Sequence, residues 1–262
     1  MVPMMLHIAI NLKILIFLVY IFGSVGSPTF ANNKLIYQLR SEASSLLDAD
    51  RLTEAIPLLE KYTNLLAEKF GYGHHLYLGG TTELAIVYNA TGRLEKAEKL
   101  LTESLAGTIA ILGSDHPNIS YISNALGDVY YNKFQFNLAE RYYLEAVAVE
   151  DKSMTSKNPR KGSTFLNLAQ IQLEKGDYDQ AQKFIERSFD FISRIIDEQS
   201  FILALNTLAK IHLGNGNINE AKKSLDRSLN ILNRVEGSKA LKIRTQNDYG
   251  ILALEIGDYV KA

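Results

Sequence analysis

The feature that most constrains this chain is an internal repeat with a period of about 42 residues, which is typical of stacked repeats. One alanine recurs at nearly equal steps, at Ala55, Ala97, Ala139, Ala181, Ala221 and Ala262. The same short pattern surrounds most of its copies: a Leu followed by Ala or Gly, a turn, the alanine, and a large apolar residue four positions on. In an architecture of this kind, each unit buries its apolar face against the next.

Within each repeat, apolar residues recur at helical spacing in two stretches that a short turn separates. Gly92, Gly176 and Gly216 mark three of these turns, while Phe134 stands at the same place in the third repeat. Pro57 is expected in the first turn of its helix, where a missing N–H costs little. The expected helix pairs span 34–70, 77–112, 118–151, 162–196, 200–234 and, incompletely, 239–262. The sequence thus predicts an all-α, right-handed superhelical solenoid of antiparallel helix pairs, with about five full repeats plus one incomplete.

Composition excludes several classes of protein. With 47% hydrophobic and 22% charged residues, the chain has enough apolar material for a compact fold. A formal net charge of −1 gives no electrostatic reason to expect nucleic acid or an anionic membrane surface as a partner. Cysteine is absent, which rules out disulfides, thiolate metal sites and cysteine nucleophiles.

The N-terminal segment 1–31 has the anatomy of a secretory signal peptide. One positive charge, Lys13, precedes the unbroken apolar run 14–22, and small or turn-forming residues follow it. Thr29-Phe30-Ala31 places small residues at the two positions that a cleavage site needs. We therefore expect a signal peptide over 1–31, a repeat domain over 32–262, and a periplasmic or secreted protein after cleavage near Ala31. The alternative is an uncleaved N-terminal membrane anchor, which Lys13 disfavours because a charge inside the bilayer is costly.

The linker between the second and third repeats identifies a family. It reads Leu112-Gly113-Ser114-Asp115-His116-Pro117, and a degraded copy, 70–75, stands at the same place one repeat earlier. Together with the Leu-Ala and Leu-Gly pairs, this linker resembles the tetratricopeptide repeat (TPR) of the kinesin light chain type over about 36–262. Gln172 and His212 depart from the pattern, because a Tyr is common at those positions, and the later linkers lack the His-Pro.

The resemblance implies a binding groove. In that family the first helix of each pair lines a concave surface that holds a peptide segment of a partner, and asparagines ahead of the Leu-Ala pair contact its backbone. An amide suits this task because it offers both a donor and an acceptor. Solvated polar residues on an exposed face are the alternative. The matching residues are Asn124, Asn206 and Asn247, Asn167 one residue out of step, and the further groove positions Tyr121, Asp128, Tyr131, Gln170, Lys210 and Arg244.

No constellation of residues predicts catalysis. Asp115-His116 could suggest a catalytic pair, but its place in the linker favours a structural role, with Asp115 capping the helix that Pro117 begins. His74, His75 and His116 lie in equivalent linkers without an accompanying carboxylate pattern. We therefore expect no catalytic residues, no metal and no cofactor.

Two functions fit these observations. The first is an exported, non-enzymatic protein–protein interaction scaffold that binds a peptide or protein segment in its groove, without nucleic acid and without membrane insertion after cleavage. The second is the recruiting or sensing region of a larger protein whose effector domain, for example a caspase-like protease, lies beyond residue 262. Self-association through the incomplete C-terminal repeat stays open.

Overall fold

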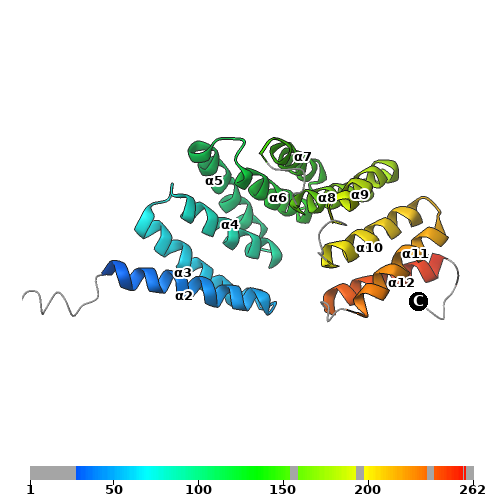
Figure 1. The fold of residues 1–262 in the computed structure, drawn as a ribbon, viewed down its shortest axis with the longest axis horizontal. Helices are drawn as coiled ribbons and strands as arrows, with labels where there is room; N and C mark the ends of the chain where they lie inside the picture. Colours follow the sequence, from blue (N-terminus) through cyan, green and yellow to red (C-terminus); the bar gives the residue numbers. More distant parts are fainter. Residues whose placement is uncertain (1–27, 154–158, 193–197, 235–238, 256, 258–262) are drawn as a thin grey trace, which may run out of the picture. The chain divides into compact units, whose positions relative to one another are not determined.

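The described part of the chain consists of helices, and short turns join the two helices of each pair (Figure 1). A computed structural model describes residues 28–153, 159–192, 198–234, 239–255 and 257, and within these residues it has eleven α-helices and no strand. This confirms the all-α fold of consecutive helix pairs. The even-numbered helices, the first of each pair, are called A helices below, and the odd-numbered ones B helices. The A helices are α2 (Pro28–Asp48), α4 (His75–Ala90), α6 (Pro117–Asn132), α8 (Pro159–Glu174), α10 (Glu198–Gly214) and α12 (Lys239–Glu255). The B helices are α3 (Leu52–Phe70), α5 (Leu94–Leu112), α7 (Phe136–Ser153), α9 (Tyr178–Ile192) and α11 (Ile218–Leu232).

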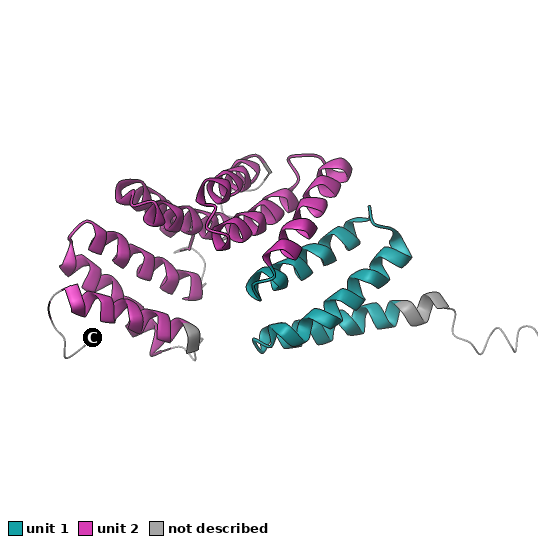
Figure 2. Cartoon of the chain, turned by 180° about the vertical axis from the view of Figure 1, so that it is seen from behind, with its two compact units in different colours: residues 1–93 teal, residues 94–262 magenta. Residues whose placement is uncertain are grey.

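The chain forms two compact units, residues 1–93 and 94–262 (Figure 2). In the first unit, α3 packs against both α2 and α4. In the second unit, the pairs α6–α7, α8–α9 and α10–α11 are each closely packed, and every pair contacts the next through α7 with α8, α9 with α10, and α11 with α12. The boundary at Arg93 and Leu94 falls between the two helices of the second expected pair.

Each A helix ends at a residue in the left-handed region of the backbone. In the third repeat, the N–H of Gln135 donates to the Tyr130 carbonyl and the N–H of Phe134 donates to the Tyr131 carbonyl, and the other complete turns repeat this arrangement. Such paired bonds satisfy the last carbonyls of the helix and require a positive φ. Glycine supplies it at Gly92, Gly176, Gly216 and Gly257, Asp50 does so in the first repeat, and Phe134 has φ +58°. A side chain at such a φ costs about 1–2 kcal/mol.

The small residues of the repeat lie where the helices cross, as the sequence predicts. The recurring alanines within the described residues, at 55, 97, 139, 181 and 221, have no exposed surface. At Gly127, a Cβ atom would lie 2.4 Å from Cε1 of Tyr143, whose ring is 2% exposed. A larger residue at this position would therefore separate α6 from α7.

Two expectations concern the N-terminal part of the chain: the place of Pro57 in its helix and the signal peptide. Pro57 is the sixth residue of α3 and not in its first turn, because the Arg51 carbonyl already accepts from the N–H groups of Glu54 and Ala55 and so starts the helix earlier. The apolar run of the expected signal peptide lies within 1–27, outside the described residues, and the expected cleavage point after Ala31 lies in the first turn of α2. No helix of the described residues is long and apolar enough to span a bilayer.

Candidate peptide-binding face

The predicted groove residues all lie on four A helices of the second unit. Tyr121, Asn124, Asp128 and Tyr131 belong to α6, Asn167 and Gln170 to α8, Asn206 and Lys210 to α10, and Arg244 and Asn247 to α12. Helix α10 contacts both α8 and α12 directly. The residues therefore share one unit, and the question is which of them a partner could reach.

Two of the asparagines bind the neighbouring A helix. Nδ2 of Asn124 donates to Oγ1 of Thr164 at 2.5 Å, and Nδ2 of Asn206 donates to Oγ1 of Thr245 at 2.8 Å. Asn124 and Asn206 stand at one position of the repeat, and their partners Thr164 and Thr245 stand at another. The same pair therefore occurs between α6 and α8 and between α10 and α12. The interface between α8 and α10 has Leu166 and Ala204 at these positions, and both belong to the apolar core.

The two asparagines differ in how much of the amide is used. Asn206 is 1% exposed, and its Oδ1 accepts a hydrogen bond from Oγ of Ser228 at 2.7 Å, so both ends of the amide are engaged. Asn124 is half-buried, and within the described residues its Oδ1 has no hydrogen-bond partner. Both ends of the Asn206 amide therefore take part in the helix packing, whereas Oδ1 of Asn124 is buried without a partner among the described residues.

A second set of contacts joins the A helices one turn further along. Nδ2 of Asn167 donates to Oδ1 of Asp128 at 3.2 Å, and Nε2 of Gln170 approaches Oγ1 of Thr207 at 3.5 Å. In the next interface, Nζ of Lys210 forms a salt bridge of 3.0 Å with Oδ1 of Asp248. Asn167 thus occupies a different position of the repeat from Asn124 and Asn206, which explains why it is out of step with them in the sequence.

Asp128 is the most perturbed acid of this face. Its Oδ1 also accepts a hydrogen bond of 2.6 Å from the Tyr143 hydroxyl. Burial of the carboxyl raises the pKa of Asp128 to about 6, although the Tyr143 hydrogen bond acts in the opposite direction. Because the carboxyl is mostly protonated below this pH, Asp128 adds little negative charge to the face there.

The Tyr131 hydroxyl on α6 lies 3.3 Å from Oε1 of Glu174 on α8. Burial and the Glu174 carboxylate raise the pKa of Tyr131, and the Arg244 guanidinium on α12 partly offsets this effect. The Tyr131 and Glu174 side chains therefore join α6 to α8 at this face. At the other end of α6, the Tyr121 ring is 39% exposed and the Arg160 guanidinium lies 5.2 Å from its centre.

The candidate face thus has an internally bonded floor and a small accessible set of side chains. Tyr121, Arg244 and Asn247 are exposed, and Tyr131 is half-buried beside them. We refer to these four residues with Asn124 as the A-helix face. Asp128, Asn167, Gln170, Asn206 and Lys210 contact adjacent A helices and hold the floor together.

A third set of contacts was not anticipated from the sequence. Glu98 on α5 accepts from the Tyr130 hydroxyl at 2.8 Å and pairs with Lys133 at 2.6 Å. One repeat on, Glu140 accepts from Gln172 and pairs with Lys175. The acid recurs on successive B helices at the spacing of the repeat, so the repeat period could have revealed it.

The same alignment explains the second departure from the family pattern. The equivalent of Glu98 and Glu140 on α9 is Gln182, whose amide donates to Glu186 of its own helix. The A-helix residue that would meet it is His212, whose pKa is lowered by burial. The Glu220 carboxylate acts on this pKa in the opposite direction, so His212 lacks the B-helix acid at position 182 but still has another acid nearby.

The histidine-bearing linkers have a capping role. Nδ1 of His116 accepts from the N–H of Asn118 at 3.2 Å, and Nδ1 of His74 accepts from the N–H of Leu76 at 3.2 Å. The expectation that Asp115 caps α6 is wrong, because His116 is the N-cap residue and Asp115 pairs with Lys152. Among the described residues, no group of three or more His, Asp and Glu side chains is arranged to hold a metal ion.

The surface expected for self-association lies at the end of the chain. Residues 258–262 are outside the described part, and α12 is the described part of that repeat. On α12, Ile243, Ile251 and Leu254 are 49%, 49% and 54% exposed. The structure leaves this prediction untested.

Comparison with known proteins agrees with the geometry. The family model described as tetratricopeptide repeat matches residues 77–152, 123–194 and 200–262. No curated protein matches the chain.

Solved structures show the same fold. The structure of BtubC (BKLC) from P. vanneervenii has a TM-score of 0.67 at 20% identity, covering 84% of this chain and 86% of the other. TPR-like repeats of a kinesin light chain from Podosopora anserina give 0.60 at 23% identity, covering 78% and 97%. PilF of Pseudomonas aeruginosa gives 0.57 at 16% identity, covering 88% and 89%. The expected likeness to kinesin light chain repeats is confirmed at the level of the fold.

Proposed function

Because this chain belongs to the tetratricopeptide repeat family, we propose that it is an exported, non-enzymatic scaffold that binds a protein segment on the A-helix face of residues 94–262. The fold makes a protein–protein interaction scaffold the best-supported function. The observation that supports this face is the presence of exposed Tyr121 and Arg244 beside side chains that bind adjacent A helices, as in the contacts of Asn206 with Thr245 and of Lys210 with Asp248.

Both the floor and the exposed groups above it favour the binding of a protein segment. Its side chains are held by adjacent helices, so a partner does not have to order them on binding. The accessible groups are of the kinds that recognise an extended segment: an aromatic ring, an amide with a donor and an acceptor, and a guanidinium.

The binding proposal is tested by capture from the producing cells with matched variants. We expect Asn247→Ala and Arg244→Ala to reduce recovery of the partner without lowering the melting temperature, because both side chains are exposed. Gln246→Ala is the control. Gln246 is also exposed, but it lies about 100° from Asn247 around the axis of α12 and so points to another side of the helix. If all three variants recover the same amount of partner, the A-helix face is not the binding surface.

Export is tested by the intact mass of the protein from its own cells. Cleavage near Ala31 gives a mass below the 29.3 kDa of the full chain by the mass of residues 1–31. A mass of 29.3 kDa would refute cleavage and favour the N-terminal anchor. Failure of export would leave the binding proposal intact, because the two rest on different residues.

A further inference from the structure

One turn of the second unit exposes an aromatic ring in an unfavourable backbone conformation. Phe134 ends the turn after α6 with φ +58°, where Gly92, Gly176 and Gly216 stand in other repeats. Its side chain is 80% exposed. Burial within the chain therefore does not offset the conformational cost, and an outlier of this kind points to a role outside the monomer.

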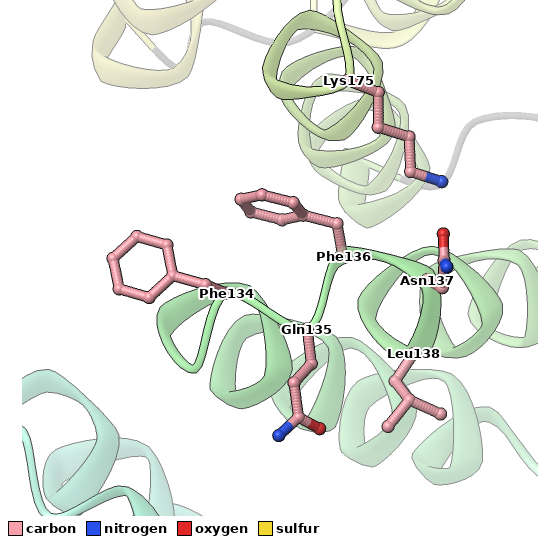
Figure 3. Close-up of a pocket in the computed structure, with 6 residues that line it drawn as sticks. All are labelled: Phe134, Gln135, Phe136, Asn137, Leu138 and Lys175. Atoms are coloured by element: carbon pink, nitrogen blue, oxygen red, sulfur yellow. The ribbon is translucent and has the colours of Figure 1, made fainter.

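A pocket lies next to this ring (Figure 3). Its volume is about 440 Å³. The Phe136 ring packs edge-on against the Phe134 ring, with centres 6.3 Å apart, and Lys175 comes from the following repeat. The residues that line the pocket form the Phe134 patch: Phe134, Gln135, Phe136, Asn137, Leu138 and Lys175.

We propose that the Phe134 patch binds a second copy of this chain, with the Phe134 ring of each copy entering the pocket of the other. A two-fold interface brings the same patch together on both copies, so it requires a projecting group and a receiving pocket on one patch. The Phe134 patch has both. The pocket is largely open to solvent, and its volume of about 440 Å³ leaves room for an aromatic side chain.

The charges at the patch permit such a contact. Lys175 pairs with Glu140, and the neighbouring Lys133 pairs with Glu98, both within the chain. Two copies can therefore approach without repulsion between like charges. With so few residues the interface is of the small class, so the dimer is weak and its amount depends on concentration. This surface is distinct from the A-helix face, and the proposal does not depend on the function of that face.

The first test is sedimentation velocity from low micromolar to near-millimolar concentration. It uses the protein as purified from the cells that express it. We expect the wild-type protein to follow a monomer–dimer equilibrium. Phe134→Gly and Phe134→Asn should weaken dimerisation at least about tenfold, as the loss of an anchoring aromatic does. Their melting temperatures, measured at a concentration where the wild type is monomeric, should be no lower than the wild-type value, because Gly and Asn tolerate this φ.

The control and the second test separate the patch from general stickiness. Tyr72→Ser removes an aromatic side chain that is 73% exposed elsewhere, and it should leave the equilibrium unchanged. Replacing Phe134 by a photoreactive benzoylphenylalanine should cross-link two copies at residues 134–138 or 175. A wild-type protein that stays monomeric at all concentrations, a Phe134→Gly protein that dimerises normally or melts lower, or cross-links outside these residues would overturn the proposal.

Discussion

The structure separates two asparagines that the sequence places in equivalent positions, and replacing each by alanine tests this distinction. Asn206 is 1% exposed and makes two side-chain hydrogen bonds, to Thr245 and Ser228. Asn247 is exposed on α12. We expect Asn206→Ala to destabilise the protein and Asn247→Ala to leave its stability nearly unchanged.

The expected size follows from the bonds that are lost. Each hydrogen bond contributes about 0.5–1.5 kcal/mol net, and a buried group left unpaired adds about 1–3 kcal/mol. Thr245 keeps its bond to the Leu241 carbonyl, so only the Ser228 hydroxyl loses its main partner. The free energy of unfolding should therefore fall by about 2–4 kcal/mol, a change of about 5–15 °C in melting temperature for a unit of this size. At the exposed position, Ala is the better helix former, and the change should be within about 0.5 kcal/mol.

Urea unfolding followed by circular dichroism measures both variants, and the chain itself suggests a rescue. The interface between α8 and α10 has Leu166 and Ala204 where this interface has Asn206 and Thr245. The double variant Asn206→Leu with Thr245→Ala should recover part of the stability that Asn206→Ala loses, because the leucine fills the space of the amide with apolar groups, while the Ser228 hydroxyl stays without its partner. If Asn206→Ala unfolds at the same urea concentration as Asn247→Ala, the packing role of Asn206 is wrong.

Two further predictions concern α6 and α4. Gly127→Ala should lower the free energy of unfolding by about 1–2 kcal/mol, since the Tyr143 ring blocks the new methyl group, whereas Gly79→Ala, with nothing within 4 Å, should raise it by about 0.5–1 kcal/mol in the same urea assay. A stabilised Gly127→Ala protein would contradict the close approach of α6 and α7. The raised pKa of Asp128 means that the folded protein holds this proton more tightly than the unfolded chain, so wild-type stability should fall, by up to about 3 kcal/mol, as the pH rises from about 4 to 6. Asp128→Asn should lack this component of the pH dependence, and equal slopes for both proteins would refute it.

The repeat period alone predicted most of the fold. The recurring alanines, the Leu-Ala pairs and the turn glycines are constrained by packing and backbone geometry within one repeat, so they can be recognised in a single sequence. The helix starts were less predictable, because Pro57 and Asp115 were assigned by local preference while the actual starts depend on the Arg51 carbonyl and the His116 ring.

The candidate site was predicted only in part, because its residues make contacts between repeats. Asn206 and Asn247 have the same residue type and the same place in the repeat, yet one is buried and the other exposed. Thr245 on α12 accepts the Asn206 amide, whereas α12, which carries Asn247, is itself the last described helix. Inspection of single repeats cannot detect this, whereas a comparison of each position with its neighbour one repeat later can.

The same comparison indicates that neighbouring repeats are not interchangeable. The A-helix interfaces alternate between Asn124 with Thr164, Leu166 with Ala204, and Asn206 with Thr245. If two repeats exchanged places, a buried amide would face Ala and a Leu would face Thr, leaving polar groups unpaired at a cost of about 1–3 kcal/mol each. Alternating polar and apolar pairs therefore favour one order of stacking over its competitors, as a single buried polar residue fixes the register of a coiled coil. This gives the internally bonded residues of the floor a function in assembly, and it leaves partner recognition to the exposed side chains of the A-helix face.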